Sequence, residues 1–223
     1  MNKQRTLILA LSLLSAVAFA ADAVAPPDEM IKTTANEVLE VIKKDAEIQA
    51  GNKKKIKDLI ETKVLPQFDF TRMTRLAVGR FWSQATPVQQ QELTNEFRSL
   101  LVRTYSASLN SYKDQKVEYK PLKMNPTDTD VVVKTSIVQP GGRAIPIDYA
   151  VAKTPNGWKV YDITVDGVSL VVNYRSSFAQ EIQQGGIAQL IRTLQTKNSS
   201  GATDSKSSES KPAETKSAET KKY

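Results

Sequence analysis

The apolar residues of this chain recur with one period near its beginning, with another in its middle, and with the first again near its end. Between residues 28 and 110 they lie three or four positions apart, which predicts amphipathic helices. Between residues 116 and 165 short segments with alternating apolar and polar residues are separated by turn residues, which predicts strands. Helical spacing returns after Gly167, and Gly185-Gly186 predicts a break between two helices there. The pattern therefore predicts an α+β fold ordered as helices, strands and helices.

The most strongly marked helix begins at Thr86. Thr86 is a capping residue, Pro87 suits the first helical turn, and Gln89 can reach back to the cap amide. A shorter helix precedes it, opened by Asp69 and ended by Gly79. The apolar stripe of the longer helix consists of Leu93, Phe97, Leu100, Leu101, Tyr105 and Leu109. The two helices form a predicted hairpin whose elbow contains the aromatic pair Phe81 and Trp82.

Two further helices are predicted upstream, over residues 28–48 and 53–63, with Gly51-Asn52 as the break between them. Lys53 to Lys55 and Lys57 crowd the first turn of the second of these helices, where the helix dipole disfavours cations. This arrangement indicates either an exposed helix start or a patch that meets an acidic group.

The strands are expected to form an antiparallel meander, because the turns between them are short. Such a sheet buries one face, and the helical hairpin and the terminal helices are the available cover. In the third strand, Ile145, Ile147, Tyr149 and Val151 point to one face. The predicted strands cover 116–123, 130–139, 143–153 and 158–165.

Neighbouring strands supply further candidates for the buried face. Val133 of the second strand and Trp158 of the fourth are expected to join it. Tyr161, however, belongs with residues that make the fourth strand apolar on both sides. Pro146 is expected at a sheet edge or a bulge, since proline donates no backbone hydrogen bond.

The two ends of the chain differ in composition from its middle. Residues 1–20 are typical of a secretory signal peptide, with Lys3 and Arg5 before an apolar run and Ala18-Phe19-Ala20 at its end. No later segment is apolar enough to cross a membrane, so a soluble exported protein is expected. Residues 21–197 are expected to form one domain. Residues 198–223, rich in Ser, Thr, Lys and Glu, are expected to be a disordered tail.

The composition excludes several kinds of chemistry. The chain contains no Cys and no His, which removes thiol nucleophiles, thiolate metal sites and imidazole-based triads. It lacks a Gly-rich phosphate loop and a G-x-S-x-G motif. Asp162 with Asp166, and Asp128 with Asp130, are better explained by turns than by paired catalytic acids or a metal site. We expect neither enzymatic activity nor a cofactor or metal. The net charge of +7 suits encounters with anionic lipid surfaces or simple solvation.

Two blocks of scattered residues carry a resemblance to a known family. One block contains Phe68-Asp69-Phe70, Gly79, Trp82, Thr86, Gln90, Phe97, Leu100-Leu101 and Thr104-Tyr105. The other contains Asp166-Gly167-Val168-Ser169-Leu170, Asn173-Tyr174-Arg175, Phe178, Gly186 and Leu190-Ile191. In this order, and over about residues 28–197, they resemble the MlaC or toluene-tolerance family of periplasmic phospholipid-binding proteins.

The resemblance implies a soluble, monomeric periplasmic carrier with an apolar pocket between helices and sheet, and with phospholipid as its cargo. It implies lipid transfer between an inner-membrane ABC transporter complex, which has a lipid-binding subunit, and an outer-membrane lipoprotein–porin complex. Such transfer maintains the lipid asymmetry of the outer membrane. Nucleic acid is not expected as a partner of an exported chain.

The residues expected to contact lipid are large, apolar and on predicted inward faces: Phe81, Trp82, Leu101, Tyr105, Val133, Ile147, Tyr149, Val151 and Trp158. Periodicity alone fits equally well a secreted α+β adaptor or chaperone-like module with a filled core. A hydrolase that uses Asp162 and Asp166 is the least favoured alternative.

Overall fold

The computed structural model describes residues 25–110 and 115–200. The expected signal peptide and the part of the expected tail beyond Ser200 lie outside these ranges. Within the described ranges, no helix combines the length and the apolar character needed to cross a membrane.

The N-terminal arm contains α1 (Pro27–Lys44), α2 (Ala46–Gln49) and α3 (Lys53–Leu59). The expectation of a single helix over 28–48 is wrong, because the chain turns at Asp45. The carboxylate of Asp45 accepts hydrogen bonds from the amides of Glu47 and Ile48, at 2.9 and 3.2 Å, and so caps α2. After α3 the helix continues as the π-helical turn η1 (Ile60–Val64) and the 3₁₀ turn η2 (Leu65–Gln67).

Three of the four lysines at the start of α3 lie within ion-pair distance of acids of the same chain. Lys54 lies 3.1 Å from Asp58. Lys55 lies 2.9 Å from both Asp45 and Glu47, so it ties α3 to the capping residue of α2. For these three lysines, the acidic group is intramolecular.

The predicted helical hairpin is confirmed as α4 (Phe70–Val78), η3 (Gly79–Gln84) and α5 (Pro87–Asn110). Asp69 caps α4 by accepting a hydrogen bond of 2.8 Å from the amide of Arg72. Thr86 and Gln89 form the reciprocal capping box, with amide-to-side-chain distances of 3.2 and 3.0 Å. Gly79 has a φ of 61°, a left-handed value that favours glycine.

The sheet is an antiparallel meander of five strands in the order β1-β2-β3-β4-β5. The four predicted strands are present, with the first ending earlier than expected. The fifth is a two-residue strand that leads into the last helix. Their bounds are β1 (Lys116–Tyr119), β2 (Asp130–Val138), β3 (Ile145–Thr154), β4 (Gly157–Val165) and β5 (Val168–Ser169).

A β-bulge explains why β4 is apolar on both sides. Val151 of β3 pairs with Val160, but the preceding Ala150 pairs with Asp162, so Tyr161 is the extra residue. The extra residue shifts the alternation by one position, which puts Val160 and Ile163 on the same face although they are three residues apart. The expectation that Pro146 lies at a sheet edge or a bulge is wrong. It is the second residue of β3, which is an interior strand of the sheet.

The last helix, α6 (Leu170–Ser200), is kinked at Gly186, whose φ is 74°. Its two halves match the two helices that the Gly185-Gly186 pair predicts. The helix also continues three residues past the expected domain boundary at 197. Asn198 explains this extension, because its side-chain amide donates to the backbone and carboxylate oxygens of Glu96 on α5.

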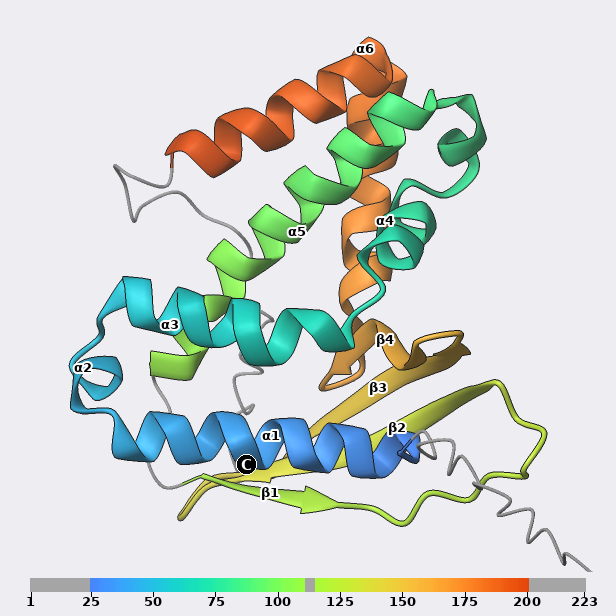
Figure 1. The fold of residues 1–223 in the computed structure, drawn as a ribbon. Helices are drawn as coiled ribbons and strands as arrows, with labels where there is room; N and C mark the ends of the chain where they lie inside the picture. The colour runs from blue at the N-terminus through green and yellow to red at the C-terminus, as the bar shows by residue number, and fades with distance from the viewer. Residues whose placement is uncertain (1–24, 111–114, 201–223) are drawn as a thin grey trace, which may run out of the picture.

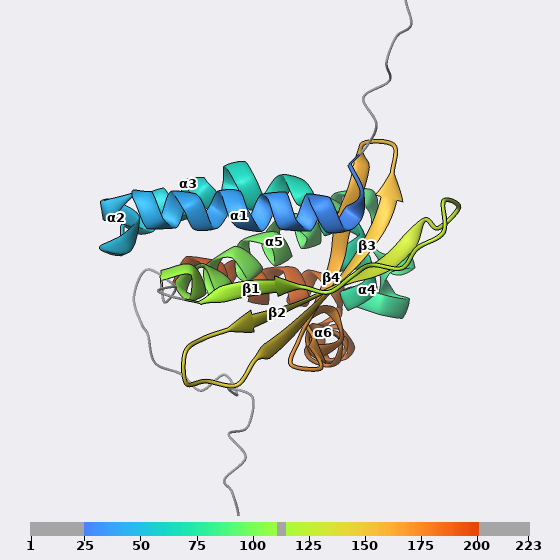
Figure 2. The same ribbon diagram turned by 90° about the horizontal axis from the view of Figure 1, so that it is seen from below.

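The helices form a layer on one side of the sheet, and α1 lies alongside the sheet (Figures 1 and 2). The hairpin and α6 share a core in which the ring of Phe97 meets those of Tyr174 and Phe178 at 5.1 and 5.2 Å. A second group, which we call the α1–sheet cluster, fills the space between α1 and one end of the sheet. It consists of Ile31, Val131, Val133, Val151, Trp158 and Val160.

Candidate functional site: an apolar cavity between helices and sheet

An apolar cavity of about 330 Å³ lies over the other end of the same sheet face. The register shows this, since Val151 pairs with Val160 in the α1–sheet cluster, while Tyr149 pairs with Ile163 and Ile147 with Val165 at the cavity. Directly opposed residues of an antiparallel pair share a face. The lining residues are Ile60, Val64, Leu65, Phe68, Phe70, Met73, Leu101, Val102, Tyr105, Ser106, Ile147, Tyr149, Ile163, Val165 and Leu170.

The helical wall of the cavity follows from side-chain spacing. Leu101 and Tyr105 are four residues apart on α5, so they lie on the same face of that helix. Ile60 and Val64 are likewise four apart, at the two ends of η1. The π-helical turn is a rare departure from regular α-helical geometry, and such turns often occur at functional sites.

Phe68 and Phe70 anchor the hairpin to the sheet beside the cavity. Phe68 forms an isolated parallel bridge with Val160, and the amide of Asp69 donates to the Val160 carbonyl at 2.9 Å. The rings of Phe68 and Phe70 stack with centroids 5.6 Å apart. These contacts hold two aromatic side chains in the cavity lining, at the point where the chain passes from the sheet into α4.

The chemistry of the lining is apolar. Among the described residues that line the cavity, none carries a charged side chain, and the polar atoms come from hydroxyl groups and backbone. Burial raises the pKa of the Tyr149 phenol, which keeps it neutral at ordinary pH. Such a surface suits hydrocarbon.

The nine residues predicted to contact lipid fall into three places. Leu101, Tyr105, Ile147 and Tyr149 line the cavity. The other two groups lie elsewhere in the packed interior. Val133, Val151 and Trp158 belong to the α1–sheet cluster, at 1%, 0% and 6% exposure, and the partly buried Phe81 and Trp82 pack in η3 against the helical core.

Several cavity residues were missed by the sequence prediction. Phe68 and Phe70 carried a usable signal, because they begin the first block of the family resemblance. Ile163 and Val165 could not be assigned to a face, since the bulge at Tyr161 reverses the alternation. The contribution of η1 depends on how the N-terminal arm packs over the sheet, which spacing does not reveal.

The acidic pairs weighed as chemical sites are engaged in local structure. Asp162 accepts hydrogen bonds from the Ser169 hydroxyl and from the amide of Val171 at the start of α6. Asp166 pairs with Arg143, and this guanidinium lowers the pKa of the Asp166 carboxyl. Over the described ranges, there is no group of three or more acids that could hold a metal ion.

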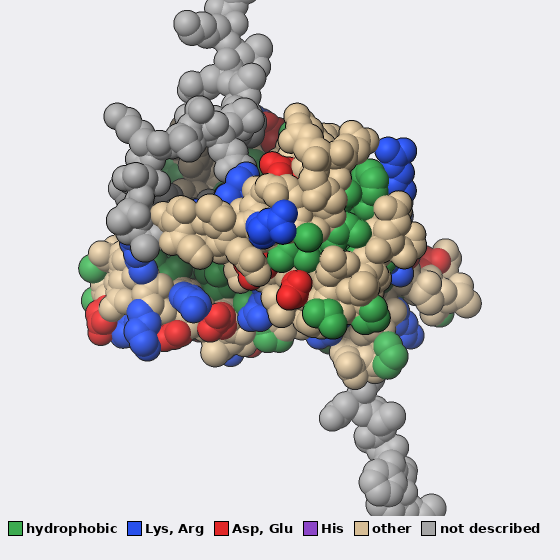
Figure 3. Space-filling view, turned by 90° about the horizontal axis from the view of Figure 1, so that it is seen from above, with side chains coloured by type: hydrophobic (Ala, Val, Ile, Leu, Met, Phe, Trp, Pro, Cys, Tyr) green, Lys and Arg blue, Asp and Glu red, His purple; other side chains and the backbone are tan. Residues whose placement is uncertain are grey.

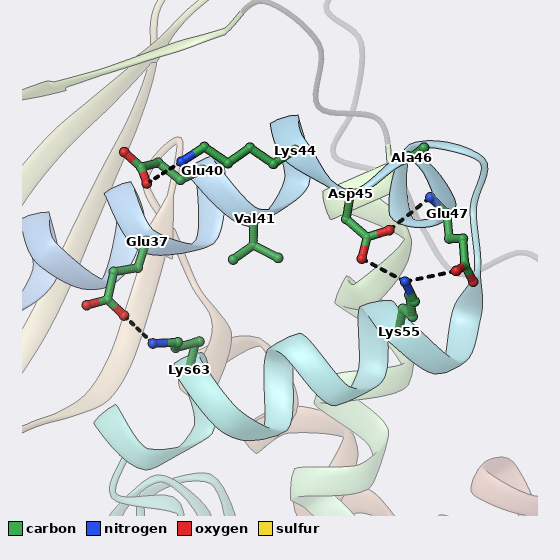
Figure 4. Close-up of a pocket in the computed structure, with 9 residues that line it drawn as sticks. All are labelled: Glu37, Glu40, Val41, Lys44, Asp45, Ala46, Glu47, Lys55 and Lys63. Atoms are coloured by element: carbon green, nitrogen blue, oxygen red, sulfur yellow. Dashed lines mark hydrogen bonds and ion pairs between the residues drawn. The ribbon is translucent and has the colours of Figure 1, made fainter.

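A second hollow, of about 650 Å³, opens between α1 and α3 but does not suit hydrocarbon. Figure 4 shows ion pairs bridging it: Lys63 lies 2.7 Å from Glu37, and Lys55 lies 2.9 Å from Asp45. Exposed ion pairs of this kind contribute little to stability. We interpret this hollow as a polar groove between two helices.

The fold and the site define the class of this protein: an α+β domain with an uncharged cavity between its helical layer and one face of an antiparallel sheet. The chain belongs to the MlaC family, whose model, described as MlaC protein, matches residues 32–196.

Relatives with known names support this assignment. The toluene tolerance protein ttg2D of Pseudomonas putida is 24% identical over 79% of this chain and 82% of its own length. The intermembrane phospholipid transport system binding protein MlaC of Haemophilus influenzae is 24% identical over 69% of this chain and 76% of its own.

A solved structure is more similar in sequence. A phospholipid-binding protein from Ralstonia solanacearum, determined in complex with a phospholipid, is 42% identical to this chain. The match covers 80% of this chain and all of that one, with a TM-score of 0.75.

Proposed function

We propose that this protein is a phospholipid carrier that holds acyl chains in the apolar cavity. The observation that carries the proposal is the uncharged cavity between layers, in a fold shared with a 42% identical protein solved with phospholipid. Leu101, Tyr105, Ile147 and Tyr149 contact the chains. Val133, Val151 and Trp158 pack beside the cavity in the α1–sheet cluster, and Phe81 and Trp82 pack against the helical core, so these five do not contact the chains.

The energetics explain why a carrier is needed. Burying a methylene group is worth about 0.8 kcal/mol, so a lipid with on the order of thirty buried methylenes costs roughly 20 kcal/mol or more to expose to water. A protein that shields the chains lowers this barrier without any covalent step. We therefore assign no catalytic residue, and the cargo takes the place of a cofactor.

Family membership supports the proposed route. The carrier is periplasmic after removal of residues 1–20. It moves lipid between an inner-membrane ABC transporter complex and an outer-membrane lipoprotein–porin complex, maintaining outer-membrane asymmetry. The chain acts as a monomer, and the transporter is the component that uses ATP.

Loading a diacyl lipid requires the cavity to widen. At about 330 Å³ its volume is near the lower end of the range for ligand pockets, which hold ligands smaller than a phospholipid. We expect the widening between η1–η2 and α5, because irregular turns rather than sheet hydrogen bonds form that wall.

The test is native mass spectrometry of the chain from residue 21 onward, purified without detergent, followed by organic extraction. We expect a mass excess that matches a phospholipid and survives gel filtration. A bare mass that stays bare after incubation with phospholipid vesicles overturns the carrier function. That result would favour an interaction module with a filled core.

A further inference from the structure

A third hollow, which we call the basic cleft, lies directly beside the apolar cavity. It has a volume of about 570 Å³ between α3, α5 and the end of α6. Leu65, Val102 and Ser106 line both spaces, so the two adjoin along these three residues. The residues that line the cleft are Gly51, Lys53, Ile56, Lys57, Glu61, Leu65, Arg98, Ser99, Val102, Arg103, Ser106 and Asn198.

The same helix contributes one face to each space. Along α5, Ser99, Arg103 and Ser106 recur at spacings of four and three, and they face the cleft. Leu101 and Tyr105 line the apolar cavity. Val102 lies between these two stripes and lines both. The cavity and the cleft therefore lie along adjacent faces of the same helix.

The described residues that line the cleft carry an excess of positive charge. Four of its lining residues are cations and one is an acid, Glu61, which lies 3.8 Å from Lys57. Among the described residues, no acid lies within ion-pair distance of Lys53, Arg98 or Arg103. The nearby Glu96 instead accepts a hydrogen bond from Asn198. This differs from the hollow between α1 and α3, whose lysines are paired.

The mixture of charge and hydrocarbon identifies a ligand chemistry. Guanidinium groups bind phosphate through paired, charge-assisted hydrogen bonds. Ile56, Leu65 and Val102 give the cleft an apolar part beside the cations. On the face that carries α5, Figure 3 shows Lys and Arg side chains bordering a hollow in which hydrophobic side chains are visible. An anion with an attached hydrocarbon chain matches both features.

Resting on the proposed carrier function, we propose that the basic cleft binds the phosphate-containing headgroup of the cargo lipid and favours lipids with a net negative headgroup. Arg98, Arg103 and Lys53 contact the phosphate. Among the described residues that line the cleft, the one acid is Glu61, and it lies 3.8 Å from Lys57, so none of these residues offers an unpaired carboxylate to the ammonium group of a zwitterionic lipid.

The test compares two lipids that differ in headgroup charge but carry the same acyl chains. Lipid-free protein is incubated with vesicles of equal parts phosphatidylglycerol and phosphatidylcholine until the bound ratio is constant. The ratio is then read by native mass spectrometry. At equilibrium the bound ratio does not depend on how often the protein meets an anionic surface. We expect the wild type to favour phosphatidylglycerol.

The variant Arg98→Gln/Arg103→Gln should lower this preference roughly tenfold, because it removes two charged contacts. Total lipid occupancy and Tm should stay near the wild-type values. Arg98→Lys/Arg103→Lys should keep part of the preference. The matched control Arg80→Gln/Arg192→Gln removes the same charge outside the cleft and should change nothing. If the double variant misfolds, the exposed Arg103→Gln alone should lower the preference about threefold.

Each outcome separates the headgroup site from the carrier function. No lipid of either kind on the wild type overturns the carrier function itself. Lipid without a headgroup preference, or with the same preference in the double variant, overturns the headgroup site alone. Calorimetric titration with inorganic phosphate tests a different source of the anion. Phosphate binding that depends on Arg98 and Arg103, with an unchanged lipid ratio, also overturns the headgroup site.

Discussion

Filling the apolar cavity with a protein side chain should remove lipid without unfolding the protein. Ile147 is the position we choose, because it lines the cavity from β3 and is only partly buried. Its neighbour across the strand pair, Val165, lines the same space. In Ile147→Trp the indole enters the cavity.

The expected loss of affinity follows from the hydrocarbon that the indole displaces. If it takes the space of about three methylene groups, at roughly 0.8 kcal/mol each, binding weakens by about 2.4 kcal/mol. That is roughly a fiftyfold increase in Kd. Overpacking a filled core costs about 1–3 kcal/mol, and a side chain that enters empty space should cost less.

The assay measures lipid occupancy by native mass spectrometry over a range of vesicle concentrations, alongside chemical unfolding of the same samples. Val133→Trp is the matched control, because Val133 is 1% exposed in the α1–sheet cluster. The control should lose stability, whereas the folded fraction should keep its lipid. If Ile147→Trp instead unfolds like the control while its folded fraction binds lipid normally, the cavity is not the binding site.

Three further perturbations test the fold. Phe97→Ala should lower the free energy of unfolding by about 3–5 kcal/mol, since the ring is fully buried; a loss below 1 kcal/mol in urea unfolding would show that the helical core is wrongly described. Thr86→Ala should cost about 1 kcal/mol by removing the cap of α5, and Ser83→Ala at the neighbouring turn serves as its control. Tyr161 has a pKa raised to about 12, mainly by burial and then by its hydrogen bond to Asp130. Its contribution to stability is therefore complete below pH 10 and lost as pH rises from 10 towards 12. In Tyr161→Phe, the free energy of unfolding measured between pH 9 and 12 should lack this fall. A variant whose stability falls with pH as much as that of the wild type would contradict the assigned role of Tyr161.

The sequence by itself determined the elements. Capping residues such as Asp69 and Thr86 act within one turn of the chain, so their hydrogen bonds are readable from residue types alone. The same holds for the helix break at Gly79 and for the meander, which short turns between strands require. Where two local signals compete, as at Asp45, a cap interrupts a continuous apolar stripe and the prediction fails.

Only the tertiary structure decided which apolar residues surround a space and which fill one. Ile147 and Val151 have the same spacing, strand and face, yet one lines the cavity and the other is fully buried beneath α1. The difference arises because α1 covers one end of the sheet, while η1 and α5 stand off from the other. Alternation records which side a residue faces. The distance to the opposing layer depends on contacts between segments far apart in the chain, such as Phe68 with Val160, and no local pattern encodes it.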